Sequence, residues 1–266
     1  MSVSEISRKS IRRILKLKTN PIPMLDVKNK LEIFAVKTGL KSAFQGSRNI
    51  EREPKKELSL LKQIAIMMKL KHKTTINPPL YFSRKPKVRS SFLKAYYNPN
   101  SFEALWIFDD PVVEAKIDDC ILGKLNEGHI LAYPKCCIRW HEEKRVLEVE
   151  SSLEDLENHI ARNPLLVHQL PIKTEEEMYK NVLNMPYPNE KNDEFWQVVN
   201  RHIIKTYERY PFVPHWACSN CLEGESKETE GLNRKYEALA LTIGFHDDFL
   251  NKINQALHDL EKAPFD

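Results

Sequence analysis

The chain has 266 residues, of which 41% are hydrophobic and 29% charged, a composition typical of a globular protein. Its most apolar window, residues 58–70, contains Lys62 and Lys69, and this excludes a membrane-spanning helix. Basic residues interrupt the apolar ones near the N-terminus, so no secretory signal is predicted and we expect a cytoplasmic protein.

The net charge of +4 is the sum of two oppositely charged regions. The first 100 residues hold 23 Lys and Arg against 6 Asp and Glu, which leaves 18 of the 41 basic and 31 of the 37 acidic residues for the rest. We therefore predict a basic, helical N-terminal region at residues 1–100 and a mostly helical cysteine-motif domain at residues 101–266. A proline-stiffened connection at residues 77–86 lies near this boundary.

One basic stretch, YFSRKPKVRSSFLKAYY at residues 81–97, combines cations with aromatic side chains. Lysine and arginine side chains that neutralise phosphates release the counterions of a nucleic acid, which favours binding. Aromatic side chains add to the affinity by stacking on the bases. The sequence thus predicts a nucleic acid or another polyanion as a partner, bound through Arg84, Lys85, Lys87 and Arg89. The alternative is that the basic region lies against the acidic region of the same molecule or forms a solvated face. Protein partners are not predicted.

Helical periodicity dominates the chain. Apolar spacing predicts helices at residues 24–39 and 55–73, with a loop at 46–54 between them, and short strands at 104–111 and 128–134 that would pair in a small sheet. A capping-box spacing of Ser151 and Glu154 predicts a helix that ends before Pro164. Further helices are expected at 174–184, 192–211 and 232–262, the last interrupted at Gly244. The predicted fold class is α+β, predominantly helical with a small β element.

The five cysteines of the chain are the main indication of a chemical function. The segment PHWACSNCLEG contains Cys218 and Cys221 in a C-x-x-C spacing, with His215 three positions before Cys218. A C-x-x-C turn brings two sulfurs to one ion, but a tetrahedral zinc ion takes four ligands. The missing ligands would come from AYPKCCIRWHEE, which holds Cys136 and Cys137. Cys120 lies among apolar residues and is expected in the core.

The local sequence around the cysteine pair favours reactive or metal-binding sulfur. Pro134 at the first position of a helix would place Cys136 and Cys137 in its first turn, where free N–H groups stabilise thiolates. Adjacent helical side chains diverge by about 100°, so we expect one of the two cysteines to bind the metal while the other packs. His141, one turn after Cys137, could be a ligand or hold a thiolate.

The residues Tyr133, Pro134, Cys136 and Cys137, followed by His215, Cys218, Ser219 and Cys221, resemble an uncharacterised prokaryotic family, a domain of unknown function. Its members carry a Tyr-Pro-x-Cys-Cys turn and a later His-x-x-Cys-Ser-x-Cys. The resemblance covers residues 122–236 and implies that the two motifs form one site, without implying an activity.

We therefore predict a metal-binding protein whose centre is formed by Cys136, Cys137, His215, Cys218 and Cys221. Zinc is the expected metal because it accepts mixed Cys and His ligation, and an iron–sulfur cluster is the alternative. A thiol redox enzyme using the C-x-x-C and an interaction protein with a structural metal also fit these residues, so enzymatic activity is left open. With 7 glycines, the chain has neither a G-x-G-x-x-G nor a P-loop motif, which excludes nucleotide hydrolysis by those folds.

Overall fold

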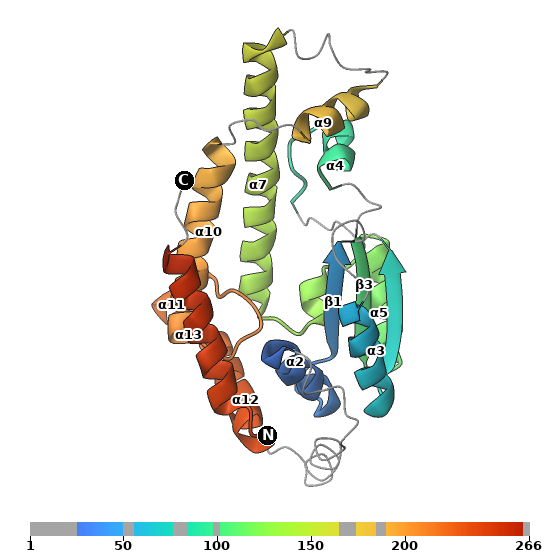
Figure 1. The fold of residues 1–266 in the computed structure, drawn as a ribbon, viewed down its shortest axis with the longest axis vertical. Coiled ribbons are helices and arrows are strands. Elements are labelled where there is room, and N and C mark those ends of the chain that lie inside the picture. The colour runs from blue at the N-terminus through green and yellow to red at the C-terminus, as the bar shows by residue number, and fades with distance from the viewer. Residues whose placement is uncertain are drawn as a thin grey trace.

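The computed structural model describes residues 26–49, 56–76, 84–97, 102–164, 174–184 and 190–262. The elements follow in the order α2 (Val27–Lys37), β1 (Ala43–Asn49), α3 (Lys56–Met67), β2 (Lys71–Ile76), α4 (Ser90–Tyr97), β3 (Phe102–Phe108), α5 (Val112–Ile121), α6 (Glu127–Ile130), α7 (Lys135–Arg162), α9 (Glu175–Leu183), α10 (Glu190–Arg209), α11 (Ser219–Glu223), α12 (Glu228–Ile243) and α13 (His246–Lys262). The prediction of a predominantly helical α+β fold is confirmed (Figure 1).

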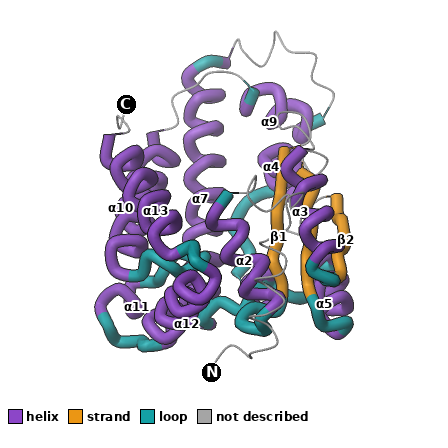
Figure 2. Tube along the Cα trace, turned by 60° about the horizontal axis from the view of Figure 1, so that its bottom comes forward, coloured by secondary structure: helices purple, strands orange, loops and turns teal. Residues whose placement is uncertain are grey.

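The only sheet among the described residues has three antiparallel strands in the order β1-β3-β2, so β3 lies in the centre. Successive side chains of a strand point to opposite faces of the sheet, and in β3 side chains of both faces are buried. Leu105 and Ile107 join the main core with α2, α3, α12 and α13, whereas Trp106 and Phe108 pack with α5 and α6. Helix α2 therefore lies between the sheet and the C-terminal helices (Figure 2).

Helix α7 is a single helix of 28 residues that stands upright in Figure 1. Its C-terminal half packs against α4 and α9 through a separate cluster formed by Phe92, Ala95, Val149, Leu153, Leu156, Tyr179 and Val182. The prediction of a helix start at Ser151 is wrong, since Ser151 and Glu154 lie in the middle of α7. A capping-box spacing also fits the interior of a helix when the apolar periodicity continues through it, as it does here from Val146 to Leu156.

The strand predicted at residues 128–134 is also wrong, because Glu127–Ile130 form the short helix α6. The side chain of Asn126 accepts a hydrogen bond from the backbone N–H of Gly128 at 2.7 Å, which starts a helical turn where the apolar run favoured a strand. The strand predicted at 104–111 is confirmed as β3, which begins earlier, at Phe102, and ends earlier, at Phe108.

Strands β1 and β2 replace part of a predicted loop and the end of a predicted helix. Helix α3 ends at Met67, because Lys69 takes the left-handed conformation with φ 55° and Leu70 donates to the carbonyl of Ala65 at 2.8 Å. The chain then enters β2 at Lys71. Residues 50–54 of the predicted loop, the first residue of the helix predicted at 55–73, and residues 77–83 of the predicted connection lie outside the described residues.

The predicted division at residue 100 stays a prediction, but the sheet joins strands from both sides of it. Ion pairs cross the same boundary, with Lys37 Nζ 3.6 Å from Asp109 and Lys252 Nζ 3.5 Å from Asp26. No helix in the described part of the chain is both long and apolar enough to cross a membrane.

Candidate metal centre

The two cysteine motifs meet although the chain between them is long. Pro134 is the N-cap residue of α7, so Cys136 and Cys137 lie in the first helical turn, as their position after the proline predicts. Cys218 is the N-cap residue of α11, and Cys221 occupies the third position of that short helix. Both motifs therefore present their sulfurs at a helix start, where backbone N–H groups lack intrahelical acceptors.

The four sulfur atoms of Cys136, Cys137, Cys218 and Cys221 all lie within 4.8 Å of one another. The Sγ of Cys221 is 3.6 Å from that of Cys136 and 3.7 Å from that of Cys137, and the sulfurs of the two adjacent cysteines are 4.0 Å apart. The expectation that one of the adjacent cysteines would pack elsewhere is thus wrong. The Cα–Cβ bonds of adjacent helical residues diverge, but the χ1 torsion of each cysteine can direct its sulfur toward the same site.

Hydrogen-bond donors surround the sulfur group. The backbone N–H of Cys218 donates to the Sγ of Cys137 at 3.4 Å, and the Thr229 hydroxyl donates to the Sγ of Cys221 at 3.1 Å. Thr229 belongs to α12 and is fully buried. Such donors are the partners that metal-bound thiolates require in their surroundings. Nothing in the sequence marked Thr229, since it lies outside both motifs and only the fold brings it close.

Burial controls the acidity of these thiols. It raises the pKa of Cys218 to about 11 and that of Cys137 further still. Burial also opposes ionisation of Cys221, but hydrogen bonds from Thr229, Ser226 and the neighbouring thiols outweigh it and lower the pKa of Cys221. A thiolate group this buried needs a compensating positive charge, and a bound cation supplies one by displacing the protons.

The surroundings of the centre are mostly apolar and rigidly connected. Cys137, Cys218 and Cys221 are buried, whereas Cys136 is half-buried. The sulfurs belong to a small hydrophobic cluster that also contains Tyr210, Val213 and Ala217. The Tyr210 hydroxyl donates to the carbonyl oxygen of Cys221 at 2.9 Å, and the backbone N–H of Ala217 donates to Thr206 Oγ1 at 3.1 Å. The loop before Cys218 is therefore fixed at both ends.

His215, the fifth predicted ligand, is not a member of the four-sulfur group. Its ring is buried and stacks on Tyr133, with a centroid distance of 4.9 Å. Within the described part of the chain, neither of its ring nitrogens has a hydrogen-bond partner. Burial lowers the pKa of His215 to about 3, so the imidazole is neutral at physiological pH. A ligand role for His215 stays a prediction.

His141 lies one helical turn after Cys137 and packs against the rings of Trp140 and Trp216. It stacks on Trp216 at a centroid distance of 5.0 Å, and burial lowers its pKa to about 4. It also lines a cavity of ≈ 180 Å³ between α6, the start of α7 and the loop that carries Trp216. Its spacing from Cys137 predicted a role for His141, but no sequence pattern indicated the cavity.

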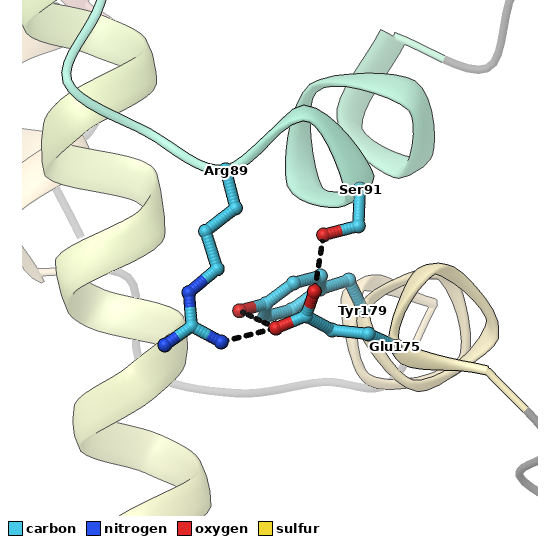
Figure 3. Close-up of polar contacts among 4 residues, drawn as sticks. All are labelled: Arg89, Ser91, Glu175 and Tyr179. Carbon is cyan, nitrogen blue, oxygen red and sulfur yellow. Dashed lines mark hydrogen bonds and ion pairs between the residues drawn. The ribbon is translucent and has the colours of Figure 1, made fainter.

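The predicted nucleic-acid residues lie far from this centre, in the segment that enters α4. Arg84, Lys85 and Lys87 are exposed. Arg89 forms an ion pair with Glu175 of α9, and the same carboxylate accepts hydrogen bonds from Ser91 at 2.6 Å and Tyr179 at 3.5 Å (Figure 3). The backbone N–H of Lys87 donates to Glu150 at 2.8 Å. These contacts agree with the alternative in which the basic region lies against the acidic one, and nucleic-acid binding stays a prediction.

Comparisons with protein-family models, with curated proteins and with solved structures give no match for this chain. The geometry of the four cysteines therefore carries the functional argument.

Proposed function

We propose that the protein binds a single zinc ion through Cys136, Cys137, Cys218 and Cys221, and that this ion has a structural role. The observation that carries the proposal is the convergence of the four sulfurs within 4.8 Å of one another. The donors come from two segments that are separated by the helices α9 and α10, so an ion between them would tie the start of α7 to the loop before α12.

The sulfur separations support one ion. Zinc–sulfur bonds of about 2.3 Å in a tetrahedron give sulfur–sulfur edges of about 3.8 Å. The separations among Cys136, Cys137 and Cys221 are 3.6, 3.7 and 4.0 Å and lie on either side of that value, and the sulfur of Cys218 lies within 4.8 Å of the other three. Zinc suits four thiolates in tetrahedral geometry, and four sulfurs fill its coordination positions without His215.

An iron–sulfur cluster is less well supported. The thiolates that hold a cubane cluster bind different iron atoms, with the inorganic sulfides between them, so their sulfurs must lie farther apart than the edges of a one-ion tetrahedron. The four sulfurs of this protein would have to separate before a cluster could be accommodated between them.

A thiol redox function is also less well supported than a metal site. Attack on a disulfide requires an accessible thiolate of low pKa. Cys218 is 4% exposed and its pKa is raised, and Cys221, although its pKa is lowered, is fully buried and therefore inaccessible to a substrate. A closed centre of four thiolates leaves no open coordination position for substrate, so the ion would stabilise the fold rather than catalyse a reaction.

Elemental analysis of protein purified without oxygen tests the proposal. We expect one zinc per chain, and tetrahedral thiolate absorption bands when cobalt replaces zinc. Iron together with acid-labile sulfide would instead establish a cluster. A metal-free protein whose Cys218 and Cys221 cycle between dithiol and disulfide would overturn the proposal in favour of redox chemistry.

A further inference from the structure

A cavity of ≈ 180 Å³ lies next to the metal centre and shares both of its supporting segments. Tyr133 and His141 line it from either side of the Cys136–Cys137 pair, and Trp216 lines it from two positions before Cys218. The stack of His141 on Trp216 at 5.0 Å connects the two segments along its wall. An ion that holds the segments together would therefore also fix this part of the cavity.

The size of the cavity suits a small organic molecule. An apolar cavity of about 150 Å³ holds a benzene molecule, so ≈ 180 Å³ accommodates a ligand slightly larger than that. Binding sites of this kind combine apolar and aromatic walls with a few placed polar groups. The rings of Tyr133 and Trp216 supply the aromatic walls.

Among the described residues, two carboxylates line the cavity. Glu142 is 7% exposed and accepts a hydrogen bond from Asn126 at 2.7 Å. Glu127 lies at the start of α6, and burial raises its pKa although the charge of Arg145 and a hydrogen bond from Gln45 oppose this rise. Carboxylates beside aromatic faces are the partners of an organic ammonium group.

Arg145 adds the opposite charge. It lines the same cavity from the third turn of α7, and its side chain is exposed, unlike that of Glu142. Because the neighbouring imidazole of His141 is neutral, Arg145 is the only cation among the described residues that line the cavity. A guanidinium group binds a carboxylate through two parallel hydrogen bonds.

We infer that this cavity binds a small zwitterion of the amino-acid class, with its ammonium group against Glu127 and Glu142 and its carboxylate toward Arg145. A simple cation would face the guanidinium of Arg145, and a simple anion would face two carboxylates. The inference rests on the proposed zinc centre only in that the ion holds Trp216 and His141 in place.

Calorimetric titration of the full-length, zinc-loaded chain with each of the twenty standard amino acids tests this inference. We expect saturable one-site binding of at least one amino acid. The corresponding amine without the carboxylate, and the acid without the amine, should each bind at least ten-fold more weakly. Failure of all twenty to bind to zinc-loaded protein overturns the inference, and equal binding of the amine or the acid overturns the zwitterion.

Substitutions locate the site. Arg145→Gln should weaken binding of the amino acid at least ten-fold and leave binding of the amine unchanged, whereas Arg139→Gln, an exposed change on the same helix away from the cavity, should alter neither. Unchanged affinity in Arg145→Gln would contradict the assignment. Zinc content is measured on the same samples: zinc-free protein counts against the proposed metal centre, and zinc-loaded protein that binds no amino acid counts against this inference alone.

Discussion

The backbone N–H of Cys218 donates a hydrogen bond to the Sγ of Cys137 at 3.4 Å, across 81 residues of sequence. This contact joins the main chain of one cysteine motif to the side chain of the other. Amide donors stabilise a thiolate ligand and orient it toward its metal. The backbone of the second motif is therefore positioned to stabilise a sulfur of the first, in addition to the convergence of the four sulfurs.

Replacing either adjacent cysteine should remove the metal. Cys136→Ser and Cys137→Ser each delete one of four sulfurs, and a three-sulfur site loses the closed tetrahedral set. We expect substoichiometric zinc in both variants after dialysis. Cys120→Ala is the matched control, because Cys120 packs with Trp106 and Val113 in a different cluster and should keep full zinc occupancy. Full occupancy in both serine variants would refute the four-sulfur site.

The Thr229 hydroxyl should tune the affinity of the centre without being a ligand. Thr229→Val keeps the shape of the side chain but removes the donor that lies 3.1 Å from the Sγ of Cys221. Loss of such an outer partner lowers metal affinity by about 10- to 100-fold. Competition with a chromophoric chelator measures the change. Thr242→Val on the same helix is the control, because the Thr242 hydroxyl donates to the carbonyl of Ala238 and should have no effect on zinc affinity. An equal loss of zinc affinity in both variants would refute a specific role for Thr229.

Removing the metal should loosen the loop before α11 and leave the sheet intact. The amides of Ala217 and Cys218 are held by Thr206 and by the Sγ of Cys137, next to the centre. Without the ion, the thiols of this cluster regain protons and the ties between the segments weaken. Hydrogen exchange followed by mass spectrometry should show faster exchange at 210–218 after chelation. Exchange in β3 serves as the internal reference, and equal rates at 210–218 with and without metal would argue against a structural ion.

The residues of the centre were predictable because their signal is local. The C-x-x-C spacing and the proline before the cysteine pair each specify geometry over a few residues, and the structure places four of the five predicted ligands together. The expectation that one of Cys136 and Cys137 would pack away from the site was wrong, because helical periodicity describes Cβ directions, whereas a sulfur lies one rotatable bond further out.

The sheet was harder to predict because two of its strands depend on the third. The sequence of β1, AFQGSRN, has no clear alternation, and β2, KHKTTI, continues a basic run that resembled the end of a helix. Both become strands by pairing with the apolar strand β3, and no local pattern carries that information. The cavity is likewise a tertiary feature, since α6, α7 and the Trp216 loop each contribute to its wall.

Acid should destabilise the protein through its buried histidines. Burial lowers the pKa of His215 to about 3 and that of His141 to about 4, whereas both rings take up a proton near pH 6.5 when the chain unfolds. Between these values the unfolded state binds more protons than the folded state. The free energy of unfolding is therefore fully maintained above pH 6.5 and falls as the pH drops toward 4, by at most about 1.4 kcal/mol per pH unit for each histidine.

Denaturant titrations of zinc-loaded protein between pH 7.5 and 4.5 measure this dependence. His215→Phe keeps a ring against Tyr133 but cannot titrate, so its free energy of unfolding should fall less steeply than that of the unmodified chain. Acid also releases zinc from thiolates, but both proteins retain the same four cysteines, so the difference between their slopes reports the imidazole. His258→Gln, at an exposed position of α13, should leave the slope unchanged. Identical slopes for His215→Phe and the unmodified chain would show that His215 does not stay neutral in the folded protein.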